Sequence, residues 1–121
     1  MKYCLVVDDS AVIRKVSRRI LESLDFEIAE ATDGKEALVS CEARMPEGVL
    51  VDWSMPEMDG YDFIKALRRM PGGERPKVIF CATDNDVGTI ARAMHAGADE
   101  YIMKPFDKEI MTLKFQQAGL L

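Results

Sequence analysis

Charged side chains end three of the apolar runs in this sequence. They are the carboxylates of Asp8 and Asp9 after residues 3–7, the carboxylate of Asp52 after residues 49–51, and the ammonium of Lys104 after residues 101–103. An unpaired charge near a core is costly, so buried strands would not repeatedly end in ionised groups unless those ends converged on one polar site. The carboxylates would hold a hard divalent cation through oxygen, and the lysine would balance the charge of a phosphoryl group. The sequence therefore predicts a metal site beside an anion site.

Strand-like and helical patterns alternate along the chain, which is typical of successive βα units and of a parallel sheet covered on both faces. Short runs rich in Val and Ile predict strands at residues 3–8, 26–30, 48–52, 77–82 and 99–103. Apolar residues at helical spacing predict helices at residues 11–24, 34–41, 61–69, 85–96 and 108–117. The fold class is therefore α/β.

Local signals mark the ends of several of these helices. Ser10, Asp33 and Asp107 can each cap a helix N-terminus, and Glu36 would complete a capping box with Asp33. Gly97 is a plausible C-cap of the fourth helix. In the first helix, one side would face the core with Ile13, Val16, Ile20 and Leu24, and the other would face solvent with Arg14, Lys15, Arg18 and Arg19.

The length and composition restrict the classes of function. We expect residues 1–121 to form a single domain without an output domain, because 121 residues leave no room for a second core. The net charge of -5 argues against direct nucleic-acid binding and favours a protein partner or a small phosphodonor. No apolar stretch is long enough for a membrane span and no signal peptide is recognised, so we expect a cytoplasmic protein. Cys4, Cys41 and Cys81 are interpreted as reduced core thiols.

Three ordered motifs together carry a resemblance to a known family. They are Leu5-Val6-Val7-Asp8-Asp9-Ser10, Val51-Asp52-Trp53-Ser54-Met55-Pro56-Glu57-Met58-Asp59-Gly60, and Tyr101-Ile102-Met103-Lys104-Pro105-Phe106. The chain resembles the receiver domains of two-component response regulators, especially the stand-alone type used in chemotaxis. The resemblance covers the whole chain. It implies a flavodoxin-like, doubly wound, five-stranded parallel sheet of order 2-1-3-4-5 with five helices, in which ligands sit at the ends of the first and third strands.

The resemblance also implies a function and partners. Asp52 would take a phosphoryl group from a histidine kinase or a histidine phosphotransferase, and the resulting acyl phosphate would serve as a timed signal. Such a domain phosphorylates itself and slowly dephosphorylates itself, and is not a conventional enzyme. Its phosphorylated and free forms would bind a downstream target differently, with control of chemotaxis as one role. We expect a monomer.

The ligand set follows from the same resemblance. Mg²⁺ would be held by Asp9, Asp52 and the backbone carbonyl of Ser54, with Asp8 helping directly or through water. Lys104 would pair with a phosphoryl oxygen, and the Lys104–Pro105 peptide bond would be cis.

One segment departs from the family pattern. Family members usually end the fourth strand with a hydroxyl residue followed by a small one, whereas here Ala82 precedes Thr83. Counted back from Lys104, the hydroxyl position falls on Ala82, and the alternation of faces along a strand could point Thr83 away from the phosphate. Either a local shift brings Thr83 into the site, which we favour, or the hydroxyl contact is missing and the coupling to the switch residue Tyr101 is weakened.

Other classes of function fit less well. An aspartyl-phosphate phosphohydrolase acting on a small molecule is the alternative, but it would want an acid two residues after the nucleophile, where Ser54 stands. Flavin binding on the same fold would want a phosphate-binding loop after the first strand, where Asp8 and Asp9 would repel an anion. A metal or phosphotransfer role for His95 is disfavoured, because it has no second histidine as partner.

Overall fold

A five-stranded parallel sheet forms the centre of the structure, a computed structural model that describes residues 1–83 and 87–121. The strands are β1 (Lys2–Val7), β2 (Phe26–Ala31), β3 (Gly48–Asp52), β4 (Lys77–Ala82) and β5 (Glu100–Met103). The helices are α1 (Ala11–Ser23), α2 (Gly34–Ala43), α3 (Gly60–Arg69), α4 (Val87–Ala96) and α5 (Lys108–Gln117). The spatial order is β2-β1-β3-β4-β5, which confirms the predicted flavodoxin-like topology.

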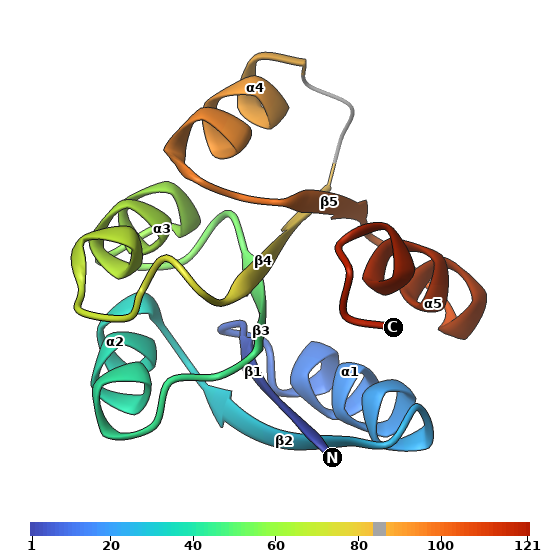
Figure 1. Cartoon of the computed structure of the whole chain (residues 1–121). Coiled ribbons are helices and arrows are strands. Elements are labelled where there is room, and N and C mark those ends of the chain that lie inside the picture. Colours follow the sequence, from blue (N-terminus) through green and yellow to red (C-terminus); the bar gives the residue numbers. More distant parts are fainter. Residues whose placement is uncertain (84–86) are drawn as a thin grey trace.

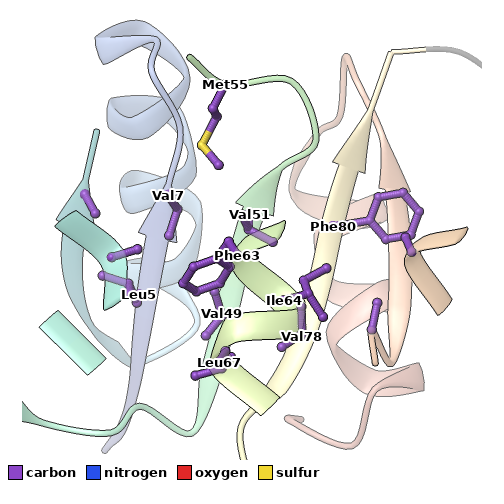
Figure 2. Packing of buried hydrophobic residues seen from close by; sticks show 14 of the residues in the cluster. Leu5, Val7, Val49, Val51, Met55, Phe63, Ile64, Leu67, Val78 and Phe80 are labelled. Carbon is purple, nitrogen blue, oxygen red and sulfur yellow. The ribbon is translucent and has the colours of Figure 1, made fainter. Parts of the chain in front are cut away.

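Helices cover both faces of the sheet and bury a separate apolar layer on each. Figure 1 shows α1 and α5 on one face and α2, α3 and α4 on the other. Because side chains alternate along a strand, Cys4 and Val6 pack with α1 and α5, whereas Leu5 and Val7 pack with α2 and α3. Figure 2 shows the layer on the side of α2 and α3, in which Phe63 of α3 lies among the strand residues.

The register of the central strands brings the predicted site residues to one level. Val7 of β1 pairs with Val51 of β3, so the acidic residues that follow them lie at the same end of the sheet. Ala82 of β4 pairs with Met103 of β5, which places Lys104 at that end as well. Every residue of β3 is buried, in agreement with its continuous apolar run.

The two edge strands have different forms of protection. β2 carries Glu27 and Glu30, and their carboxylates pair with Arg44 at 2.8 Å and with Arg18 at 2.7 Å. β5, at the other edge, has four residues.

The predicted N-caps are present, but Glu36 accepts from the N–H and the hydroxyl of Thr32 and so does not complete the expected capping box with Asp33. Side chains of Ser10, Asp33 and Asp107 each accept a hydrogen bond from a backbone N–H of the first turn of α1, α2 and α5. Asp59 caps α3 in the same way, which the sequence reading had not singled out. Gly97 follows α4 with φ of 124°, a backbone region that favours glycine.

The structure corrects the expected exposure of two residues of α1. Val16 is 41% exposed, so it does not belong to the buried face, and Ser17 and Leu21 are buried instead. Arg14 is half-buried because its guanidinium reaches back to the backbone carbonyl of Asp8. The start of the fourth helix, expected at Asn85, lies outside the described residues.

The remaining expectations concern the cysteines and the membrane. Cys4, Cys41 and Cys81 are buried with free thiols, as predicted. Burial raises the pKa of the Cys4 thiol to about 12 and that of the Cys41 thiol to about 11, so both stay protonated at neutral pH. Among the helices of the described residues, none has the length and apolar character needed to cross a bilayer.

Candidate functional site

Three carboxylates converge at the carboxyl end of the sheet. Asp8 and Asp9 follow β1, and Asp52 ends β3 next to it. One oxygen from each lies within 4.8 Å of the others. Asp8 and Asp52 are buried and Asp9 is exposed, so the cluster opens to solvent on the side of Asp9. The predicted convergence is therefore present.

Lys104 completes the site from the other end of the sequence. Its ammonium donates to Asp8 Oδ2 at 2.8 Å and to Asp52 Oδ1 at 3.1 Å. The backbone N–H of Lys104 donates to the Ala82 carbonyl at 2.8 Å, and the Lys104–Pro105 bond is cis, as the resemblance implied. The ammonium is thus held between the two buried carboxylates.

Backbone contacts fix the direction of Asp8. Its N–H donates to the Ala31 carbonyl of β2 at 3.1 Å, and Oδ1 accepts from the N–H of Ser10 at 2.9 Å. Arg14 of α1 donates to its carbonyl at 2.7 Å, a contact that the sequence reading missed. Oδ2 of Asp8 remains directed at Lys104.

The loop after Asp52 is held by its neighbours in a similar way. The N–H of Trp53 donates to the Cys81 carbonyl at 3.1 Å, and the N–H of Gly60 donates to the Trp53 carbonyl at 2.8 Å. A Cβ at Gly60 would lie 2.7 Å from the Asp52 carbonyl oxygen, so the start of α3 packs directly on the backbone of Asp52. The loop therefore needs glycine at this point.

The charges of the site influence one another. Burial raises the pKa of the Asp52 carboxyl above its usual range, and the charges of Asp8 and Asp9 add to this effect against the opposing pull of Lys104. Burial alone would lower the pKa of the Lys104 ammonium, but the hydrogen bond to Asp8 and the charge of Asp52 raise it above its usual value. Lys104 therefore stays charged at neutral pH.

A small cavity lies beside Asp52. Its volume is about 80 Å³, and its lining comprises Asp52, Trp53, Ser54, Cys81, Ala82, Thr83 and Thr89. Thr83 thus shares the cavity with Asp52, although Ala82 is the last residue of β4. Thr89 of α4 supplies a third hydroxyl residue, after Ser54 and Thr83, and the sequence reading missed it.

Aromatic rings connect the site with β5. Ring centroids of Trp53 and Phe80 are 5.5 Å apart, and those of Phe80 and Tyr101 are 6.1 Å apart. Tyr101 is half-buried, and the ammonium of Lys114 from α5 lies 4.2 Å from its ring centroid. Trp53, next to the acidic cluster, is therefore in contact with the β5–α5 region through one intermediate ring.

The donor set fits a hard divalent cation. Clustered carboxylates with an open side match the preference of Mg²⁺ for a few carboxylates plus water and phosphate oxygens. The described residues near the cluster offer no thiolate or imidazole ligand, since Cys81 is a buried thiol whose pKa is raised by burial. The residues present thus fit the metal that the family resemblance implied.

A parallel sheet of order 2-1-3-4-5, with an acidic cluster and a lysine at its carboxyl end, defines a class of signalling domain that the sequence comparison identifies independently. The chain matches the response regulator receiver domain family over residues 4–116 and belongs to that family. The predicted family is therefore confirmed.

Individual members of the family resemble the chain over nearly its full length. It is 34% identical over 114 residues to the chemotaxis protein CheY1 of Helicobacter pylori, covering 93% of this chain and 92% of that protein. The structure of CheY4 of Vibrio cholerae superimposes with a TM-score of 0.93 at 28% identity, covering 98% of both chains. The receiver domain of a sensor histidine kinase from Pseudomonas aeruginosa, with a magnesium ion coordinated in its active-site cleft, gives a TM-score of 0.86 at 27% identity and covers 98% of both chains.

Proposed function

We propose that Asp52 is the phosphoacceptor of this receiver domain. The observation that carries the proposal is the pair of contacts from Lys104 to Asp8 and Asp52 beside a small open cavity, because these hold a cation where a phosphoryl oxygen would arrive. A carboxylate oxygen of Asp52 would form a bond to phosphorus while the bond from phosphorus to a histidine nitrogen of the donor breaks. The histidine leaves with the electron pair of that bond and takes up a proton.

The chain's own residues would orient the incoming group. Lys104 would turn its ammonium from the carboxylates to the phosphoryl oxygens, a stronger charge-assisted contact. Asp9, Asp52 and the carbonyl of Ser54 would hold Mg²⁺, with Asp8 contributing directly or through water. When bound, the metal would neutralise the carboxylates and a phosphoryl oxygen, which otherwise repel each other. Support comes from the acidic cluster and from the magnesium bound by the Pseudomonas receiver domain.

The biological role proposed is phosphorelay signalling with a histidine kinase or phosphotransferase as donor. Phosphorylation would be autocatalytic with the donor bound, and slow self-dephosphorylation would end the signal. The chemotaxis proteins among the relatives favour a role in motility. Family membership leaves the phosphohydrolase alternative without support.

Phosphoryl labelling tests the assignment. The protein is incubated with acetyl phosphate and MgCl₂, and the phosphorylated residue is located by peptide mass spectrometry after borohydride reduction, which converts an aspartyl phosphate to homoserine and releases the phosphate. We expect one label, on Asp52, and its loss in Asp52→Ala. Asp62→Ala, which removes an exposed carboxylate from α3, serves as the control and should label like the wild type. Labelling that persists in Asp52→Ala would refute the proposal.

A further inference from the structure

A basic hollow lies between α3 and α4, away from the acidic cluster. Its volume is about 360 Å³, and its lining comprises Tyr61, Lys65, Arg68, Arg69, His95 and Ala96. Among residues 1–83 and 87–121, no acidic residue contributes to this lining, although the chain has five more acidic than basic residues. A concentration of cations on an acidic protein is a local feature that the overall charge does not explain.

The cations of the hollow differ in how far they are engaged. Arg68 is a structural residue, since its guanidinium donates to the carbonyls of Gly97, Gly73 and Pro76 and pairs with Asp99 at 3.0 Å. Within residues 1–83 and 87–121, neither Lys65 nor Arg69 has a carboxylate within ion-pair distance. These two charges are available to an incoming anion.

The ring of Tyr61, which lines the hollow, lies close to two cationic side chains. The ammonium of Lys65 lies 5.0 Å from the ring centroid of Tyr61, and the guanidinium of Arg92 from α4 lies 4.8 Å from the same ring. Two cations therefore share one ring in the folded protein, which reduces the freedom that they would lose on binding a ligand. The guanidinium of Arg92 also lies 6.0 Å from the ring centroid of Trp53, the residue after Asp52.

The helix dipole explains only part of this arrangement. Arg68 and Arg69 lie in the last turn of α3, where a cation is favourable. Lys65 and Arg92 lie outside the last turns of their helices and bring like charges near each other, which destabilises a protein unless an anion relieves the repulsion. A ligand is therefore a better explanation of the whole cluster.

We propose that this α3–α4 hollow binds a short acidic segment of a partner protein. Lys65 and Arg69 stand four residues apart on one helix face, a spacing that suits two carboxylates of a peptide. A nucleic acid is longer than the hollow and would extend past it by more than the Debye length, which is about 8 Å at physiological salt. There it would meet the rest of a protein whose net charge is -5, which disfavours binding. The proposal does not depend on phosphorylation of Asp52.

The test uses the intact, metal-free protein and a defined probe. The probe is a helical peptide with Glu pairs four residues apart, and its control is the same peptide with each Glu replaced by Gln. Binding is followed at low salt by amide NMR shifts and by the fluorescence of Trp53, the single tryptophan. We expect shifts centred on residues 61–69 and 92–96 with the Glu peptide, and none there with the Gln peptide.

Matched variants separate a local site from a general charge effect. K65Q/R69Q removes two cations from the hollow, and K15Q/R19Q removes the same two residue types at the same spacing from exposed positions of α1. We expect about five-fold weaker binding or more in the first and less than two-fold in the second, given the typical strength of exposed ion pairs. Arg69→Gln, at an exposed position, gives the same direction with the least risk to folding.

Three results would overturn the proposal. Equal weakening in the two double variants would assign the binding to net charge alone, and unchanged binding in K65Q/R69Q would place it elsewhere. Inorganic phosphate that produced the same shifts at the same concentration would make the hollow a small-anion site and not a peptide-binding surface. Each result is independent of whether Asp52 accepts phosphate.

Discussion

Asp52 carries its negative charge at a cost in the metal-free protein. Burial and the charges of Asp8 and Asp9 raise its pKa, so the folded state binds a proton more tightly than the unfolded state does. Removing the charge should therefore stabilise the fold. We expect Asp52→Asn to raise the free energy of unfolding in EDTA at pH 7 by about 1 kcal/mol, or a few degrees in Tm, as measured by thermal and urea denaturation.

The sign of this effect can be checked by pH. An acid with a raised folded-state pKa contributes most to stability below that pKa, where it is protonated. The advantage of Asp52→Asn over the wild type should accordingly shrink as the pH falls from 7 through the folded-state pKa. An advantage that grew on acidification would contradict the assigned direction.

Lys104 and a metal ion use the same carboxylates. The ammonium of Lys104 lies 2.8 Å from the Asp8 carboxylate and 3.1 Å from the Asp52 carboxylate. Mg²⁺ must therefore bind close to a positive charge that repels it. Lys104→Met should therefore tighten Mg²⁺ binding by about ten-fold, since a unit charge at this distance is worth a few kcal/mol before screening. Titration of Trp53 fluorescence or calorimetry measures the affinity. Lys77→Met, an exposed residue at the opposite end of the sheet, should leave it unchanged.

At the scale of elements, α3 is fitted directly against the backbone of the site. Gly60→Ala would bring a Cβ to 2.7 Å from the Asp52 carbonyl oxygen and 3.0 Å from the Trp53 Cα, and backbone cannot yield as a side-chain end does. We expect a loss of about 1 to 3 kcal/mol in stability and a slower rate of phosphorylation by acetyl phosphate.

A matched change at another glycine separates the two effects. Gly48→Ala would place its Cβ 2.8 Å from Leu120 Cδ1, the end of a flexible side chain remote from Asp52. This variant should lose less stability and phosphorylate at the wild-type rate. If both variants slowed phosphorylation equally, the packing of Gly60 on Asp52 would not be the cause.

Periodicity explains why most elements could be predicted from the sequence. The bounds of β3 and β4 agree residue for residue, because continuous apolar runs between polar ends define buried parallel strands. Val16 was misassigned because an apolar residue at helical spacing does not reveal where the helix meets the sheet; the small Ser17 occupies the buried position. Local pattern fixes an element, whereas packing fixes its rotation.

The residues of the site likewise fall into those that local pattern predicts and those that depend on packing. The convergence of Asp8, Asp52 and Lys104 was predictable because the carboxyl ends of parallel strands share one edge. The cavity lining by Thr89 and the contact of Arg92 with Trp53 depend on how α4 lies against β4 and α3, and no local spacing encodes that.

At the scale of the whole molecule, phosphorylation of Asp52 has to change the conformation of the β5–α5 region. This change either depends on a contact of the Thr83 hydroxyl with the phosphoryl group or occurs without that contact. If the hydroxyl of Thr83 contacts the phosphoryl group, Thr83→Ala should leave phosphorylation intact and reduce the change at Tyr101, since a hydrogen bond to a charged acceptor is worth about 1.5 to 3 kcal/mol. If it does not, Ala82→Thr should strengthen that change instead. Amide NMR shifts around Tyr101 with and without beryllofluoride, in wild type and both variants, distinguish the two.

The structure favours one of these two alternatives for Thr83. Because Thr83 lines the cavity beside Asp52, we expect the first alternative. A change at Tyr101 of wild-type size in Thr83→Ala would contradict it, and would leave the contact of Trp53 with Phe80 as the remaining route.

The two edges of the sheet determine how copies of this protein can meet in a crowded cell. An exposed, flat edge strand invites another chain to add a strand, the first step toward aggregation. Here Glu27 and Glu30 place arginine-paired charges along β2, and β5 offers only four residues to an incoming strand. Strand addition is thus discouraged at both edges. A signal that brought two copies together would have to do so through helices, whose contacts can be reversed without exposing the sheet.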